Sequence, residues 1–109
     1  PTLPKTASKI MPNLSNMGLD ALVRGGTLDI GAEERDDATE IVIRATGAKI
    51  AFDPQIGEAL AGRLDPADLT GRTAPAHVLS LIAARSGGMI QTHAEEGTLL
   101  LGATLPHEG

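Results

Sequence analysis

Residues 6–26, TASKIMPNLSNMGLDALVRGG, decide the fold because they predict a helix that ends sharply and continues into a strand. Apolar or small side chains recur every three or four positions, which gathers them on one face of a helix. Thr6 is the expected N-cap, and Arg24 is expected in the last turn, where the helix dipole favours a cation. Gly25 and Gly26 supply the left-handed residue that ends the helix. The apolar face consists of Ala7, Ile10, Met11, Leu14, Met17, Gly18, Ala21 and Leu22.

Pro12 and the residues after the glycine pair modify this pattern. Pro12 removes one helical donor, so we expect a kink or an irregular turn there. Beyond the glycines the pattern alternates, which predicts a half-buried strand, and residues 40–46, EIVIRAT, predict a second strand antiparallel to it. The acidic stretch 33–37 between them is expected to be a solvated hairpin loop, with a docking surface for a basic partner as the alternative. The buried face of the first strand is expected to hold Leu28, Ile30 and Ala32.

The middle of the chain predicts two further helices. Asp53 is the expected N-cap of a short helix that begins at Pro54 and ends at Gly62. A single turn is expected at residues 66–69. A longer helix has Pro75 in its first turn, after Thr73 or Ala74, and ends at the glycine pair 87–88. The predicted inward-facing residues are Ile56, Ala59 and Leu60 in the short helix, and Val78, Leu79, Ile82 and Ala83 in the longer one.

The last part of the chain predicts a second hairpin. Residues 89–93 and 98–105 form its strands around a turn at 94–97. The element order is then α-β-β-α-α-β-β over a single domain, residues 1–109. This order predicts an α+β fold, a two-layer α/β sandwich with helices packed on one face of a mixed or antiparallel sheet. Leu99, Leu101, Ala103 and Leu105 are expected to face the core.

Composition excludes several classes of function. The 109 residues carry a net charge of −5 and one aromatic residue, Phe52, whereas nucleic-acid binding uses clustered cations and stacking rings. There is no cysteine for disulfides or thiolate metal sites, and no apolar run approaches the roughly 20 residues of a membrane span. We expect a cytoplasmic domain with no nucleic-acid or membrane partner. Because the sequence begins at Pro1, without an initiator methionine, we also expect it to be a fragment of a longer protein.

The histidines are the side chains best suited to proton or phosphoryl chemistry, and they are scattered. His77, His93 and His107 have no spacing typical of a metal site. His77 is expected on the exposed side of its helix, and His93 is expected to be exposed at a strand end. Glu108 could orient His107, but chain ends seldom hold preorganised chemistry. We expect no catalytic residue, no metal and no cofactor in this chain.

The first helix, the glycine-terminated helices and the final hairpin resemble the ATP-binding domain of sensor histidine kinases, the Bergerat (GHKL) fold, over residues 5–106. In that family the first helix carries two asparagines four positions apart, and the second holds Mg²⁺ and the nucleotide phosphates. The resemblance assigns Asn13 to the first position and Met17 to the second. A thioether is a poor ligand for Mg²⁺, which prefers oxygen.

The other two nucleotide motifs of that family also depart from their patterns. The DxGxG motif, whose aspartate binds the adenine amino group, corresponds to residues 45–49, ATGAK. The glycine-rich motif that wraps the phosphates corresponds to residues 71–76, GRTAPA, where Pro75 removes an N–H. The resemblance therefore implies a kept scaffold with an abandoned nucleotide pocket. Its vestigial positions are Asn13, Met17, Ala45, Gly47, Lys49, Gly71 and Thr73.

That combination closely resembles the C-terminal domain of the alphaproteobacterial histidine phosphotransferase family (ChpT-like). The matching stretches are LPKTASKIMPNLSNMGLDALVRGGTLDI, IVIRATGAKI and RTAPAHVLSLIAARSGG. The family implies a preceding dimeric helical domain that bears the phosphorylated histidine. It also implies relay of phosphoryl groups between receiver domains of a hybrid histidine kinase and of response regulators.

For this chain, the resemblance implies a scaffold that braces the helical domain and adds docking surface, because the acceptor histidine lies outside it. Arg24, Lys49 and Arg72 are the cations nearest the former pocket and could meet an acidic receiver surface, with ordinary solvation as the alternative. Two other functions stay open. The chain could be the ATP-binding catalytic domain of a sensor histidine kinase, or a stand-alone interaction module.

Overall fold

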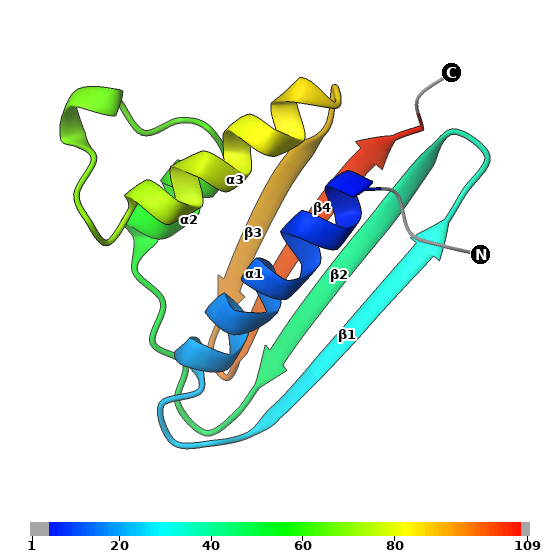
Figure 1. The fold of residues 1–109 in the computed structure, drawn as a ribbon. Helices are drawn as coiled ribbons and strands as arrows, with labels where there is room; N and C mark the ends of the chain where they lie inside the picture. The colour runs from blue at the N-terminus through cyan, green and yellow to red at the C-terminus, as the bar shows by residue number, and fades with distance from the viewer. Residues whose placement is uncertain (1–4, 108–109) are drawn as a thin grey trace.

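The computed structural model describes residues 5–107 and has two layers, a four-stranded sheet and a layer of helices on one of its faces (Figure 1). Every strand pairing is antiparallel, and the strand order is β1-β2-β4-β3. The predicted α+β architecture is confirmed, with an antiparallel rather than a mixed sheet. The elements are α1 (Lys5–Ala21), β1 (Thr27–Glu34), β2 (Ala38–Thr46), α2 (Pro54–Leu60), the 3₁₀ turn η1 (Pro66–Asp68), α3 (Ala74–Arg85), β3 (Met89–Glu95) and β4 (Thr98–Pro106).

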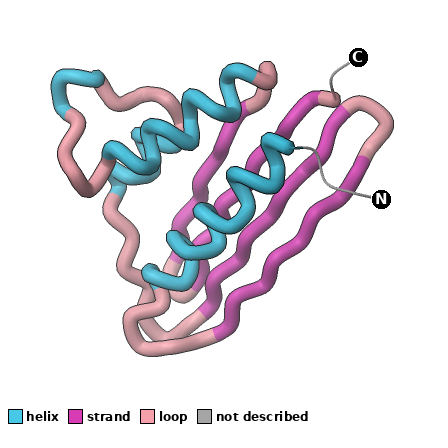
Figure 2. Tube along the Cα trace, in the orientation of Figure 1, coloured by secondary structure: helices cyan, strands magenta, loops and turns pink. Residues whose placement is uncertain are grey.

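The core lies between the helices and the sheet (Figure 2), and it includes residues of α1, α2 and α3 and of β2, β3 and β4. Ile41, Ile43 and Ala45 of β2 are fully buried, and each pairs directly with a buried residue of β4. On the helix, Gly18 lets the backbone approach the sheet, because a Cβ there would lie 3.1 Å from Cγ2 of Ile43. The remaining core side chains of α1 are Ala7, Ile10, Leu14 and Ala21, and those of β4 are Leu99, Leu101, Ala103 and Leu105.

The start of α1 differs from the prediction. The helix begins at Lys5, so Thr6 lies in its first turn and is not the N-cap. Its hydroxyl instead shares a hydrogen bond of 2.9 Å with the hydroxyl of Ser86, just after α3. The helix runs through Pro12 without interruption, so the predicted irregular turn does not form. The first turn of α1 is thereby joined directly to the end of α3.

The end of α1 differs from the prediction in the position of Arg24. The helix stops at Ala21, so the exposed Arg24 follows it and does not lie in its last turn. Gly25 and Gly26 have φ angles of 78° and 144°, which confirms the predicted left-handed exit. At this end of the sheet, backbone segments without side chains pack together. The Gly47 N–H donates a hydrogen bond of 3.0 Å to the Gly97 carbonyl.

β1 is an edge strand and is far more exposed than predicted. Leu28 is half-buried, but Ile30 is 50% exposed and Ala32 is also exposed. β1 nonetheless pairs antiparallel with β2, as predicted, and Ile30 lies opposite the buried Ile43. α1 lies over β2 and β4 and leaves β1 beyond its cover (Figure 1). The hairpin residues 33–37 are exposed, as expected.

The predicted caps of α2 are confirmed. Asp53 Oδ1 accepts a hydrogen bond of 2.9 Å from the Gln55 N–H, and Pro54 occupies the first turn. Gly62, with a φ angle of 75°, follows the helix. η1 confirms the predicted single turn. In the final hairpin the strands extend further than predicted, so only Glu96 and Gly97 form the turn.

α3 buries a different stripe from the predicted one. Its buried residues are Ala76, Leu79, Ser80 and Ala83. Leu79 and Ala83 confirm the prediction, and Ile82 is partly buried. Val78, which was predicted to face inward, is 51% exposed, so that assignment is wrong.

Candidate functional site: the cleft between α1, α2 and α3

The region that corresponds to a nucleotide pocket contains a cleft of about 340 Å³. One wall comes from the C-terminal half of α1, another from the loop before α2 and from α2 itself, and the third from the start of α3. Its floor is mostly apolar. The lining residues are Met17, Asp20, Ala21, Ala51, Phe52, Asp53, Ile56, Arg72 and Pro75.

The charged groups of the cleft are Asp20, Asp53 and Arg72. Arg72 Nε lies 3.7 Å from Asp53 Oδ2, and this ion pair joins the segment before α3 to the N-cap of α2. Both carboxylate oxygens of Asp53 are therefore engaged, since Oδ1 caps the helix. The Arg72 side chain is 74% exposed, so water weakens the pair and its contribution to folding stability is small.

Phe52 separates this cleft from a second hollow of about 310 Å³ between α2 and β3. Gly57 lies against its ring, where an added Cβ would be 3.3 Å from Phe52 Cε2. A side chain at position 57 would also meet the Thr92 hydroxyl at 3.0 Å. The half-buried ring of Phe52 thus packs against Gly57 of α2 and also borders both hollows.

The structure brings only some of the vestigial positions to the cleft. Met17 lines it, as does Pro75 of the third motif. Ala45 is fully buried in the core, and Thr73 is 1% exposed, with its hydroxyl accepting from the Thr70 N–H over 2.9 Å. Asn13, Lys49 and Gly71 are exposed and lie outside the lining.

Of the two glycines kept from the nucleotide motifs, only Gly47 has a steric reason in this structure. A Cβ on Gly47 would lie 2.6 Å from the Gly25 carbonyl oxygen, so packing alone requires glycine there. Nothing lies within 4 Å of a Cβ built on Gly71. The survival of Gly47 is therefore explained without a phosphate.

Sequence reasoning missed the residues that form the far wall of the cleft, Phe52, Asp53 and Ile56. Asp53 and Ile56 were recognised as parts of a helix start, but nothing in the sequence places that start opposite Met17. Asp20, another lining residue, could have been predicted from the sequence. It lies three residues after Met17, and residues three apart share a helix face.

The residues present do not fit a magnesium-bound nucleoside triphosphate. Position 45 offers a buried methyl group where adenine recognition needs a carboxylate, and Met17 offers sulfur where Mg²⁺ needs oxygen. Pro75 has no N–H to donate, Asp20 adds a negative charge that would repel phosphates, and the cation of the lining, Arg72, is paired with Asp53. Between residues 5 and 107, no group of three or more His, Asp or Glu side chains is placed to hold a metal ion.

The histidines lie apart from this cleft. His77 is half-buried rather than exposed, and its Nδ1 atom is buried without a hydrogen-bond partner. His93 is exposed as predicted and lies 2.8 Å from Glu95 Oε1. His107 Nε2 lies 3.1 Å from the hydroxyl of the buried Thr39. The pairing of His107 with Glu108 concerns a residue outside the described part of the chain.

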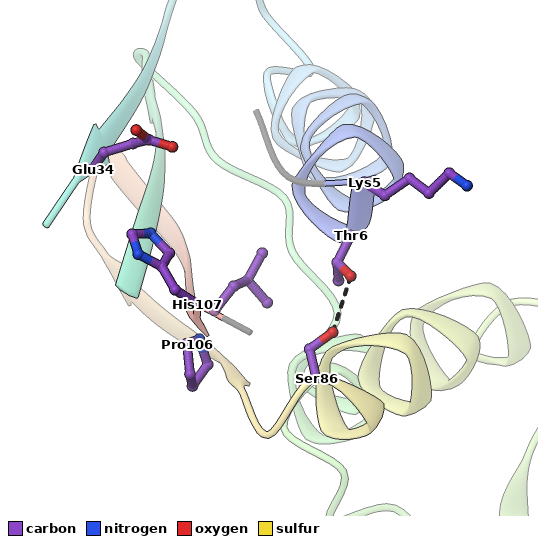
Figure 3. Close-up of a pocket in the computed structure, with 7 residues that line it drawn as sticks. Lys5, Thr6, Glu34, Ser86, Pro106 and His107 are labelled. Atoms are coloured by element: carbon purple, nitrogen blue, oxygen red, sulfur yellow. Dashed lines mark hydrogen bonds between the residues drawn. The ribbon is translucent and has the colours of Figure 1, made fainter. Parts of the chain in front are cut away.

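His107 lines another hollow, of about 370 Å³, at the end of the molecule where α1 begins (Figure 3). The Thr6 and Ser86 hydroxyls bond to each other on one side of it, while Glu34 and His107 lie on the other, and the Lys5 side chain points away from both. These polar groups do not converge on a common point, so the hollow has no arrangement suited to catalysis.

No helix in the described part of the chain is long and apolar enough to cross a membrane.

Solved structures that are similar to this chain include a phosphotransferase and a histidine kinase domain. A bacterial phosphotransferase is 26% identical with a TM-score of 0.76, and the match covers 93% of this chain and 49% of that one. The nucleotide-free catalytic domain of the histidine kinase ThkA is 16% identical with a TM-score of 0.68, covering 93% of this chain and 65% of that one. The second match shows the predicted kinase-like fold. This chain thus spans about half the length of the phosphotransferase.

Comparison with curated proteins gives no match. The family model of the histidine phosphotransferase C-terminal domain, however, matches residues 1–98, most of the chain. The sequence resemblance, the kinase-like fold and this match agree. The chain belongs to the histidine phosphotransferase C-terminal domain family.

Proposed function

We propose that this chain is the non-catalytic, non-nucleotide-binding C-terminal domain of a histidine phosphotransferase. The rest of the parent protein is a helical domain that bears the phosphorylated histidine and forms a cytoplasmic homodimer. The parent relays phosphoryl groups between receiver domains of a hybrid histidine kinase and of response regulators. Family membership supports the phosphotransfer role, and the 26% identical phosphotransferase supports it independently.

The observation that carries the proposal is the chemistry of the cleft. A kinase domain must hold ATP, and the groups that would do so are replaced at Met17, Ala45 and Pro75. Each missing contact to a buried polar group costs about 1–3 kcal/mol, and the losses together leave nucleotide affinity negligible. The domain then contributes a rigid body to the parent, with a docking surface for the receiver. Arg24 and Lys49 are exposed candidates for that surface, whereas Arg72 is engaged with Asp53.

The first test is nucleotide binding. ATP with Mg²⁺ at millimolar concentration should leave the melting temperature of this chain unchanged, because a ligand raises stability only by binding the folded state preferentially. Differential scanning fluorimetry with an extrinsic dye measures this shift. A histidine kinase ATP-binding domain measured in parallel should melt at a higher temperature with ATP. A rise of several degrees for this chain would instead support the kinase alternative.

The second test is phosphoryl transfer. A receiver domain phosphorylated with ³²P should label the full-length parent but not this chain alone, because the acceptor histidine is proposed to lie in the helical domain. Autoradiography after gel electrophoresis detects the label. Labelled His77, His93 or His107 in the isolated chain would refute the non-catalytic assignment. A parent that acquires no label from several receivers would favour a stand-alone interaction module.

A further inference from the structure

α3 carries a second apolar stripe on the side away from the core, and only Ile82 at its margin also packs partly against the core. Val78, Leu81, Ile82 and Arg85 follow the i, i+3, i+4, i+7 spacing and centre about half a turn away from the buried stripe. Val78 and Leu81 are each 51% exposed. Together with Ile82, Ala84 and Arg85, which all belong to this one helix, they line a shallow hollow of about 510 Å³ that is open to solvent. We call this set of five residues the outer stripe.

The outer stripe is unusual for a helix that covers a sheet. Such a helix normally has polar residues on the side away from the core, and a helix that is apolar on both sides is normally covered on both sides. Adjacent exposed aliphatic side chains that also form a hollow are typical of surfaces that bind a partner. The other exposed large apolar side chains among residues 5–107 are Leu19 and Val23 near the end of α1, Ile30 on β1, Val42 on β2 and Met89 on β3, and none of them lines this hollow.

The charge of the outer stripe indicates what covers it. The chain has 14 acidic residues and a net charge of −5, yet residues 74–85 contain no Asp or Glu. Arg85 lies at the end of the hollow and makes no ion pair with any residue from 5 to 107. A second copy packed through the same helix would offer Arg85 no carboxylate from α3. The complementary surface therefore has aliphatic side chains and a carboxylate.

We infer that the outer stripe is a docking surface for an amphipathic helix of a partner protein, with aliphatic side chains in the hollow and an Asp or Glu against Arg85. A helix laid into an apolar groove is a common mode of recognition, and the charge pair would fix its orientation. The inference goes beyond the proposed function, because it requires neither a phosphoryl group nor the cleft. It stands even if the transfer assays fail.

The test uses two fluorescein-labelled peptides of about 20 residues, long enough to form a helix, that share one leucine stripe. One peptide has glutamates beside the stripe and the other has lysines. Fluorescence anisotropy should give at least about tenfold tighter binding for the glutamate peptide, since a desolvated charge pair discriminates strongly. The net charge of −5 would by itself favour the lysine peptide, so this preference can come only from a local cation.

Variants of the outer stripe test whether the preference for the glutamate peptide arises there. Leu81→Asp should weaken the glutamate peptide at least about tenfold, because it places a carboxylate in the hollow. Arg85→Glu should reverse the preference between the peptides. Ile30→Asp is the matched control, since Ile30 is equally exposed but lies on β1, and it should leave binding unchanged. Circular dichroism and melting curves confirm that each variant is folded.

Three outcomes would overturn the inference. The first is absence of binding by either peptide, and the second is equal loss in Leu81→Asp and Ile30→Asp. The third is a dimer of the free chain in sedimentation velocity that Leu81→Asp dissociates, which would assign the outer stripe to a second copy of this chain.

Discussion

Gly47 occupies a corner where three loops meet without room for a side chain. Its N–H binds the Gly97 carbonyl, and a Cβ would lie 2.6 Å from the carbonyl oxygen of Gly25. Backbone atoms cannot move aside as a flexible side chain would. The constraint is steric, because the φ angle of Gly47 is not in the left-handed region.

Gly47→Ala should therefore destabilise the fold by about 1–3 kcal/mol, the usual cost of forcing a methyl group into a packed position. Urea unfolding monitored by circular dichroism measures the change. Gly31→Ala is the matched control, since its Cβ would have nothing within 4 Å, and it should change stability by less than about 0.5 kcal/mol. Equal stability of the two variants would show that the corner tolerates a side chain.

At the same scale, the sequence predicted which chemistry the cleft lacks but not which residues enclose it. Met17 could be assigned because the family resemblance places it at the second asparagine position of the first helix. The ion pair of Arg72 with Asp53 joins residues 19 positions apart across two loops, and loop conformation leaves little trace in sequence patterns. The hydrogen bond between Thr6 and Ser86 was unpredictable for the same reason.

Among the elements, α3 shows why an apolar pattern does not identify the buried face by itself. Leu79 belongs to the core, and Leu81, two residues later, belongs to the outer stripe. Val78 lies three and four residues before Leu81 and Ile82, so its spacing matches the outer stripe and not the buried one. The small residues Ala76, Ser80 and Ala83 mark the true core face, because they allow the helix to lie close to its neighbours.

Leu79→Ala should lower the free energy of unfolding by about 2–5 kcal/mol, because it removes a side chain that is 3% exposed and leaves a cavity. Leu81→Ala changes the same side chain at a 51% exposed position and should cost less than about 1 kcal/mol. Chemical denaturation of the two variants side by side measures the difference. Similar losses would mean that Leu81 is also covered in the free protein.

In the whole molecule, the strand order leaves β1 and β3 as the two edges of the sheet. The hairpins were predictable from alternation and turn residues, but the pairing of β2 with β4 was not. That pairing joins residues about 60 positions apart, and it is selected by the shared core beneath α1. Exposure of Ile30 on β1 follows from that order and not from the local pattern.

The acidic side chains of β1 protect its free edge from pairing with another chain, a common use of charge on edge strands. The triple variant Asp29→Asn, Glu33→Gln and Glu34→Gln should therefore associate more than the wild-type chain does at the same concentration. Light scattering during incubation measures this change. The expected sign follows from removing repulsion between like-charged edges that would otherwise approach within hydrogen-bonding distance.

A charge-matched control separates the edge from the net charge. A second triple variant removes the same number of negative charges from helical elements and consists of Glu58→Gln, Asp68→Asn and Asp20→Asn. This second triple variant should scatter no more light than the wild type. If both variants associate equally, overall repulsion rather than the β1 edge keeps the chains apart.

The position of Phe52 between two hollows has a spectroscopic consequence. The chain contains neither tryptophan nor tyrosine, so it is nearly transparent in the near ultraviolet and has almost no intrinsic fluorescence. An indole introduced in place of this one ring would therefore emit against a dark background. The emission maximum and the quenching of this tryptophan would respond to a ligand that binds in the cleft between α1 and α2. The measurement needs no added label and has no background from other aromatic residues.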